Sequence, residues 1–391
     1  MNRAAASARG VITAYYGLAG VVNALWGATL PATDARLELG PGRLAGLLLA
    51  LAVGALAGMP VAGRLAGRWG APRLLCGSAA ASSLGLAVVG TAPTAELLTF
   101  AAVLLGVLFG AFNVALSVQA VAVERAAGTA LMARMHGTWT LGAVAGGAGV
   151  AAGLHAGGSV QAVMGFGALG LAVAALALGR VPLPALPESP AAPPDGRPLR
   201  SRLMIALGVV GIAAFITEGA ATDWAGVHAS WVLGVEPASA SLGYTVFFAA
   251  MTAVRFAGDA LRSRLGAAVT VRLAGGVTTA GFVLVQLAGP VPAGFACALV
   301  GWALAGAGTA LVWPIVISEL GAVSGSARTL SLVTMISYGG GLVGPPLIGS
   351  VATTAGLPSA LLLPTALALG VAVAAPAVLR VARHPSSTTG G

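Results

Sequence analysis

Stretches of about twenty apolar residues recur along the chain between residues 11 and 380, and short polar loops that carry arginine separate them. The first stretch, residues 11–30, is long enough to cross a hydrocarbon layer about 30 Å thick as a helix rising about 1.5 Å per residue. Because lipid offers the backbone no hydrogen-bond partner, we expect every stretch to be helical. The pattern predicts spans at roughly 11–30, 43–63, 72–91, 96–119, 137–156, 160–179, 203–222, 240–260, 267–287, 293–317, 327–350 and 357–379.

The composition agrees with an all-α protein embedded in a bilayer. Hydrophobic residues make up 58% of the chain and charged residues only 8%, whereas a soluble domain carries about 25% charged residues. Cys76 and Cys297 both fall inside predicted spans, and the four histidines are dispersed. We therefore expect no disulfide framework, no metal site and no cofactor.

The positions of the arginines predict the orientation of the helices across the membrane. The chain has no lysine, and with both termini placed inside, seventeen of its arginines lie at the cytoplasmic side. Only Arg36 and Arg43 fall outside, and Arg255 lies within a span. This bias follows the positive-inside rule, and it predicts a multi-pass protein of a bacterial plasma membrane with both ends cytoplasmic. The net charge of +9 is spread over separate loops, so it reflects topology and attraction to anionic lipid and does not indicate nucleic-acid binding.

The sequence divides into two similar halves. The proline-rich stretch 181–202 predicts a cytoplasmic linker between six-span bundles at 1–180 and 203–391. The halves match at an offset of about 195–198 residues: Arg68 with Arg264, Glu124 with Glu319, and the pair Gly142/Gly146 with Gly340/Gly344. Internal repeats of this kind are how secondary transporters are built. We therefore expect two pseudo-symmetric six-helix bundles.

The loop after the second span contains a distinctive pattern of glycine and arginine. Residues 63–73 read Gly-Arg-Leu-Ala-Gly-Arg-Trp-Gly-Ala-Pro-Arg, which is similar to the Gly-x-x-x-Asp-Arg-x-Gly-Arg-Arg signature of the major facilitator superfamily. Gly67 stands at the Asp position, whereas the corresponding stretch of the second half keeps Asp259. Within that superfamily, residues 119–125 and 217–224 resemble uncharacterised bacterial relatives of fucose-type permeases. The resemblance implies a twelve-helix fold that works by alternating access.

Polar side chains within the apolar segments gather on the first, fourth, seventh and tenth spans. Groups of this kind are costly against lipid and should face the interior of the bundle, and the family resemblance implies that these four helices line the central path. The candidate solute-binding residues, with Tyr338 added from the eleventh span, are Asn23, Trp26, Asn113, Gln119, Trp302, Trp313 and Tyr338. The alternative is that the amides only bond neighbouring helices.

Glu218 is the candidate proton carrier. A carboxylate at the centre of a spanning helix costs about 2.5–3.5 kcal/mol on insertion scales, and less near the interface. A carboxyl group in such a place can take up and release a proton in the physiological range. Asp223 is a second acceptor nearer the outer mouth. The alternative is that both carboxylates are hydrated or cap helix ends.

The remaining charges predict ion pairs. Arg255 has two possible partners, Glu218 across a cavity and Asp259 four residues later on the same helix face, and it also has a possible role in binding an anionic substrate group. Arg68 with Glu124, and Arg264 with Glu319, predict two equivalent cytoplasmic latches that break when the halves rock. The alternative for the two arginines is that they only set topology.

These features favour a monomeric secondary transporter that takes up a sugar-like or small polar solute together with protons. Efflux of a small amphipathic compound or drug by proton antiport is the alternative. The glycine-rich stretch 142–149 lacks the proline that is typical of drug antiporters, which disfavours efflux. A non-transporting membrane sensor is a further alternative. An enzyme is not expected, since the sequence shows no nucleophile–base pair and no nucleotide loop.

Overall fold

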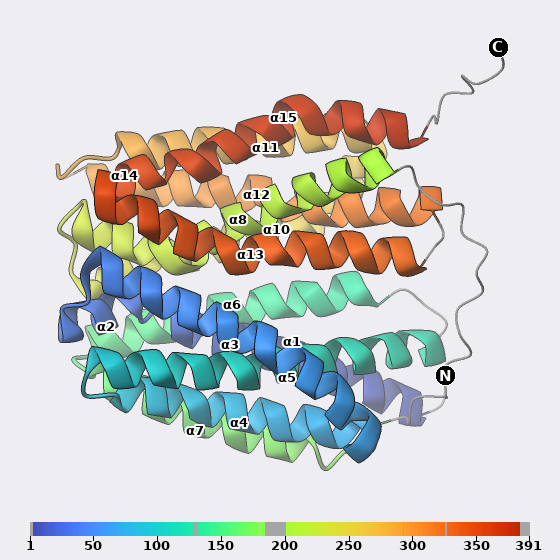
Figure 1. The fold of residues 1–391 in the computed structure, drawn as a ribbon, viewed down its shortest axis with the longest axis horizontal. Helices are drawn as coiled ribbons and strands as arrows, with labels where there is room; N and C mark the ends of the chain where they lie inside the picture. The colour runs from blue at the N-terminus through green and yellow to red at the C-terminus, as the bar shows by residue number, and fades with distance from the viewer. Residues whose placement is uncertain (1–2, 128–130, 184–200, 292, 325–326, 384–391) are drawn as a thin grey trace. The chain divides into compact units, whose positions relative to one another are not determined.

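The computed structural model describes residues 3–127, 131–183, 201–291, 293–324 and 327–383, and these residues form helices joined by short turns (Figure 1). Most of the predicted linker, residues 184–200, lies outside the described part. The helices of the first half are α1 (Arg3–Gly27), α2 (Leu30–Leu37), α3 (Gly40–Trp69), α4 (Ala71–Thr91), α5 (Ala95–Ala127), α6 (Met132–His155) and α7 (Val160–Leu178). Those of the second half are α8 (Ser201–Trp231), α9 (Pro237–Ala240), α10 (Leu242–Leu265), α11 (Ala267–Leu287), α12 (Gly294–Ser324), α13 (Ala327–Ala355), α14 (Leu357–Ala360) and α15 (Leu362–Arg383).

Each predicted span coincides with a long helix, which confirms the all-α membrane fold. Within the described residues, ten helical segments are long and apolar enough to cross a membrane. Helices α6 and α13 occupy the other two predicted spans and are not among these ten. The number of twelve crossings therefore stays a prediction.

The chain forms two compact units. Unit 1 comprises Met1–Ser189 with Ala225–Phe248, and unit 2 comprises Pro190–Trp224 with Ala249–Gly391. Unit 1 thus contains α1–α7 together with the end of α8, α9 and the beginning of α10. The division of the sequence into bundles at 1–180 and 203–391 stays a prediction.

The same helix pairings recur inside both units. In unit 1, Gly142 and Gly146 of α6 lie against the backbone of α1 at Gly17 and Val21. In unit 2, their counterparts Gly340 and Gly344 of α13 lie against α8 at Ile212 and Ile216. Helix α4 packs on α7 in unit 1, and α11 packs on α15 in unit 2. The internal repeat in the sequence is therefore also a repeat in packing.

The repeated Arg-x-Gly loops have a backbone explanation. Gly70 and Gly266 follow α3 and α10 with positive φ angles of 83° and 75°, a conformation that costs glycine little and other residues more. Each donates its backbone N–H to the carbonyl four residues earlier, at Ala66 and Arg262. The glycine lets one helix end and the next begin immediately at Ala71 or Ala267.

Glycines also allow a close contact between α3 and α5 in unit 1. A Cβ placed on Gly54 or Gly58 of α3 would collide with the backbone of α5 at Val103 or Val107. A Cβ on Gly106 or Gly110 of α5 would collide with α3 in turn. Two GxxxG motifs therefore face each other, which is how small residues bring membrane helices together.

We expect Gly106→Leu to destabilise the protein by about 3 kcal/mol or more. The added side chain would collide with the rigid backbone of α3 at Leu51 and Ala55. The loss of stability should therefore lie at the upper end of the range that is typical of overpacked positions. Thermal unfolding in detergent measures this loss. Gly46→Leu is the matched control, because a Cβ at this exposed position of α3 meets no atom within 4 Å. Equal stability of the two variants would contradict the proposed close contact.

Candidate functional site

A charged pair lies within the apolar helices of unit 2. The Nη2 of Arg255 on α10 is 3.9 Å from the Oε2 of Glu218 on α8. The two side chains are 18% and 23% exposed respectively, so both remain accessible. A separation of 3.9 Å is too long for a hydrogen bond, and the pair is held by charge attraction alone. The pair is therefore loose in its geometry, with no direct hydrogen bond between the two groups.

Three aromatic rings accompany the charged pair. Phe215 lies one turn before Glu218 on α8, and its ring is 4.5 Å from Tyr338 of α13 and 5.1 Å from Trp313 of α12, measured between centroids. Tyr338 lies close enough to Glu218 and Arg255 for both charges to act on its hydroxyl group. It is 43% exposed despite its position within a long helix. Helices α8, α10, α12 and α13 therefore place two opposite charges and an aromatic cluster at one site, which we call the charged aromatic site (Glu218, Arg255, Phe215, Trp313 and Tyr338).

Two other predicted residues of unit 2 lie elsewhere. Trp302 is buried about three turns before Trp313 on α12, and its ring packs edge-on against Phe282 of α11 at 5.5 Å. Asp223 is buried on α8, five residues beyond Glu218. The side chain of Asp259, the alternative partner of Arg255, lies outside the described residues.

A second polar and aromatic group occupies unit 1. The amide Nδ2 of Asn23 on α1 donates a hydrogen bond of 3.0 Å to the hydroxyl of Tyr244 on α10. The ring of Tyr244 lies tilted against Phe248 with centroids 4.6 Å apart, and Phe248 contacts Trp139 of α6 edge-on at 5.7 Å. Asn23 therefore joins α1 to a buried aromatic cluster.

The other predicted residues of unit 1 differ in their surroundings. Asn113 donates its amide to the carbonyl of Phe109 on its own helix, 2.9 Å away. The indole N–H of Trp26 and both amide atoms of Gln119 are buried without a hydrogen-bond partner among the described residues. A buried polar group without a partner is unusual and calls for a water or ligand.

The structure corrects the predicted latch of the second half. Glu319 is paired with Arg262, whose Nη2 is 2.9 Å from its Oε1, and Arg262 also donates to the Oγ of Ser318 at 2.7 Å. Arg264, which the repeat indicated as the partner, is exposed. Residues two apart on a helix lie on nearly opposite faces, so only Arg262 of these two points to α12.

The predicted latch of the first half also differs. Among the described residues, Arg68 and Glu124 form no ion pair, and Arg68 is exposed. The Oε2 of Glu124 instead accepts hydrogen bonds from the backbone N–H groups of Leu131 and Met132, at 2.7 and 2.9 Å. Those N–H groups at the beginning of α6 have no partner within the helix. Glu124 therefore ties the end of α5 to the beginning of α6.

Sequence reasoning missed three residues that matter here, Phe215, Tyr244 and Arg262. Phe215 and Tyr244 lie in apolar stretches where another ring changes nothing in the hydropathy pattern. Arg262 was overlooked because the repeat aligns Arg264 with Arg68. The spacing of three between Phe215 and Glu218 was the one available signal that both share a helix face.

Comparisons with known proteins place the chain in a family. No family model matches it. An uncharacterised transporter, y4wD, from Sinorhizobium fredii is 31% identical over 90% of this chain and 93% of its own length. An uncharacterised MFS-type transporter from Yersinia pestis is 32% identical over 86% of each chain.

Solved structures share the fold at low sequence identity. The xylose transporter XylE from E. coli aligns with a TM-score of 0.73 over 100% of both chains at 12% identity. A mutant of the nucleoside transporter NupG aligns with a TM-score of 0.73 over 95% of this chain and 99% of its own, at 13% identity. The transporter FucP in its outward conformation aligns with a TM-score of 0.64 over 99% of this chain and 100% of its own, at 17% identity. The chain belongs to the major facilitator superfamily and is a membrane transporter of that family.

Proposed function

We propose that this protein is a secondary active transporter that takes up a sugar-like or small polar solute together with protons, by alternating access. The observation that carries the proposal is the loose, partly exposed pair of Glu218 and Arg255 within long apolar helices. Ionisable groups at such depth are costly and usually belong to a substrate or proton path. Tyr338, Trp313 and Phe215 supply a polar hydroxyl and aromatic faces beside the pair.

The pair links proton and solute chemically. When Glu218 accepts a proton, its attraction for Arg255 is lost, and the guanidinium becomes free to donate hydrogen bonds to a solute. When the solute leaves, Arg255 attracts the carboxylate again and favours release of the proton. Asp223, on the same helix, is a second proton acceptor in this scheme.

The remaining candidate residues serve recognition. Trp313 and Tyr338 offer aromatic rings and a hydroxyl group at the charged aromatic site. Trp302 contributes indirectly, because its contact with Phe282 fixes α12 against α11. In unit 1, Asn23, Trp26, Asn113 and Gln119 contribute polar groups. Among them, the unpartnered atoms of Trp26 and Gln119 have hydrogen-bonding capacity left for water or solute.

The names of two structural neighbours agree with this class of solute. One is a fucose:proton symporter from E. coli and another a D-xylose-proton symporter. Both names combine a sugar with a proton. They are 17% and 13% identical to this chain, and their names support our proposal of a sugar-like solute and of the proton as coupling ion.

A second candidate function is efflux of a small amphipathic compound or drug by proton antiport. The cluster of Phe215, Trp313 and Tyr338 favours it, because three adjacent rings suit an apolar ring system as well as the face of a sugar. The same charged pair serves antiport if solute and proton compete for it.

The proposed setting is the plasma membrane of a bacterium, with both termini cytoplasmic and the protein working as a monomer. The arginine bias supports this orientation. The protein needs no cofactor in this scheme, since the gradient of protons supplies the driving force.

Proton movement in liposomes tests the proposed function. Purified protein is reconstituted with a pH-sensitive dye inside, and fucose, xylose or a nucleoside is added outside as the probe. We expect one class of probe to acidify the lumen of liposomes that contain the protein and to leave the pH inside protein-free liposomes unchanged. Solute-dependent alkalinisation would indicate antiport instead. Solute movement without any proton movement would contradict proton coupling in either direction.

A further inference from the structure

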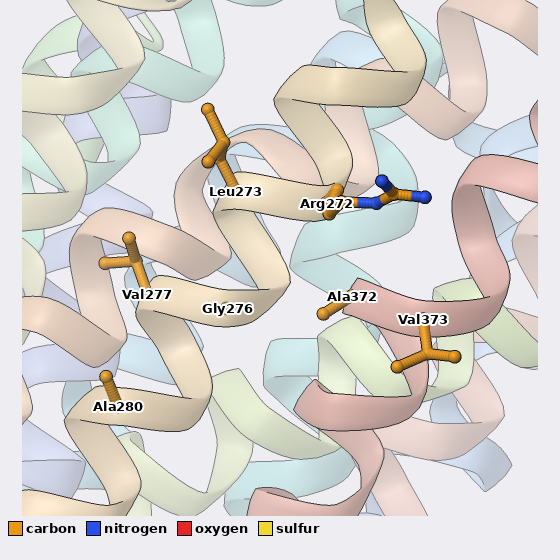
Figure 2. Close-up of a pocket in the computed structure, with 7 residues that line it drawn as sticks. All are labelled: Arg272, Leu273, Gly276, Val277, Ala280, Ala372 and Val373. Atoms are coloured by element: carbon orange, nitrogen blue, oxygen red, sulfur yellow. The ribbon is translucent and has the colours of Figure 1, made fainter.

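Unit 2 has a groove between α11 and α15 that the proposed transport cycle does not use (Figure 2). Its volume is about 590 Å³, within the range of about 300–1,000 Å³ that is typical of ligand pockets. Its walls are small and aliphatic, apart from one arginine. The residues that line it are Arg272, Leu273, Gly276, Val277 and Ala280 on α11, with Ala372 and Val373 on α15.

Small residues create the hollow. Gly275 of α11 lies against the backbone of α15 at Ala372 and Ala368, so the two helices meet closely there. The next residue, Gly276, faces open space, because a Cβ at this position meets no atom within 4 Å. Close helices with missing side chains on one side leave an apolar hollow on the surface.

The exposure of the walls indicates an apolar occupant. Val373 is 68% exposed and Leu273 is 50% exposed, as expected of side chains that contact lipid in a membrane helix. A hydrocarbon chain fits such walls, because it forms dispersion contacts along them and leaves no polar group without a partner.

Arg272 gives the groove a positive end. It is exposed in the second turn of α11, and in Figure 2 its guanidinium extends from α11 on the side of α15. Neither α11 nor α15 contains a single Asp or Glu in its sequence, so neither helix neutralises this charge. Arg380 lies on the face of α15 that carries Val373, seven residues later. Both arginines belong to the side predicted to be cytoplasmic, where the leaflet is anionic.

We propose that this groove binds an anionic phospholipid, with one acyl chain along α11 and α15 and the phosphodiester group on Arg272. The charge of the headgroup complements Arg272, and the aliphatic walls complement the chain. Arg380 adds positive potential near the same end and holds its own Nε–H on the carbonyl of Pro376 at 3.2 Å. The bound lipid covers the contact between α11 and α15 and is separate from the charged aromatic site.

Native mass spectrometry of the whole protein in detergent tests this proposal. Phosphatidylglycerol and phosphatidylcholine with identical acyl chains are the probes, with palmitate as a third. A basic residue at a membrane surface contributes about 1 kcal/mol, so we expect roughly fivefold greater retention of phosphatidylglycerol than of phosphatidylcholine. Arg272→Gln should abolish this preference, and Gly276→Leu should lower retention of both lipids by filling the groove.

Matched controls separate this site from general attraction to lipid. Arg73→Gln removes an exposed arginine from unit 1, and Gly370→Leu adds a side chain to α15 where a Cβ meets no atom within 4 Å. Both should retain the preference. Equal loss in Arg73→Gln and Arg272→Gln, equal retention of both phospholipids, or retention of palmitate as strong as that of phosphatidylglycerol would overturn the proposal. If Gly276→Leu fails to fold, the two arginine variants decide the question.

Discussion

The Glu218→Gln protein should still exchange solute across the membrane but should lose proton-driven accumulation completely. Glutamine has nearly the shape of protonated glutamic acid, so the charged aromatic site keeps its volume and its aromatic neighbours. It cannot take up or release a proton, and its neutral amide no longer attracts Arg255, which lies 3.9 Å from the carboxylate in the parent protein. Solute concentrations should therefore become equal on both sides of the membrane and rise no further.

Uptake of labelled solute into liposomes, with and without a pH gradient, measures this effect. Glu218→Asp keeps a titratable group and should retain part of the accumulation. Glu96→Gln is the control, because this carboxylate at the beginning of α5 is exposed. Full pH-driven accumulation by Glu218→Gln would exclude Glu218 as the proton carrier.

Arg262→Gln should destabilise unit 2 by about 3 kcal/mol. The substitution removes the 2.9 Å ion pair of Glu319, whose side chain is only 2% exposed. Breaking a buried ion pair from one side costs about 3–5 kcal/mol, and the lower end applies because Arg262 is itself 32% exposed. Thermal unfolding in detergent measures the change.

Two further variants decide whether the ion pair is the cause. The free energy of unfolding of Arg264→Gln should stay within about 0.5 kcal/mol of that of the parent protein. Arg264 is exposed, and substitutions of surface residues outside a buried ion pair or the core usually have effects of this size. The double variant Arg262→Gln with Glu319→Gln should recover part of the loss, since the buried side chain at position 319 is then neutral and no longer depends on the 2.9 Å contact with Arg262. If Arg264→Gln is as unstable as Arg262→Gln, the assignment of the partner is wrong.

The fold could be predicted from the sequence because membranes simplify the problem. The length of the apolar segments, the placement of the arginines and the offset between the two halves can all be seen in the linear sequence, without knowledge of which residues contact each other. The predicted spans accordingly all lie on helices. The close contact of α3 and α5 is likewise written in the sequence as the GxxxG motifs at Gly54/Gly58 and Gly106/Gly110, because a Cβ at any of these positions would collide with the facing backbone.

The site could be predicted only in part. Glu218 and Arg255 stand out because a charge within an apolar helix is rare. Rotation about the helix axis is harder to infer, because helices that are apolar all round give no periodic signal. For that reason Arg264 was assigned the partner that Arg262 has, and Trp302 was grouped with Trp313 although it packs on Phe282. The role of Phe215 follows only from its contacts.

Thiol labelling at Tyr338 tests alternating access most directly. In a background with Cys76 and Cys297 replaced by alanine, Tyr338→Cys is exposed to a membrane-impermeant maleimide in right-side-out and in inside-out vesicles. Leu169→Cys is the control, because Leu169 is an exposed apolar residue of the spanning helix α7 and should react from neither side. We predict that Tyr338→Cys reacts from both sides, since each side has access to the charged aromatic site in turn. Reaction from one side only, or from neither, would contradict the account.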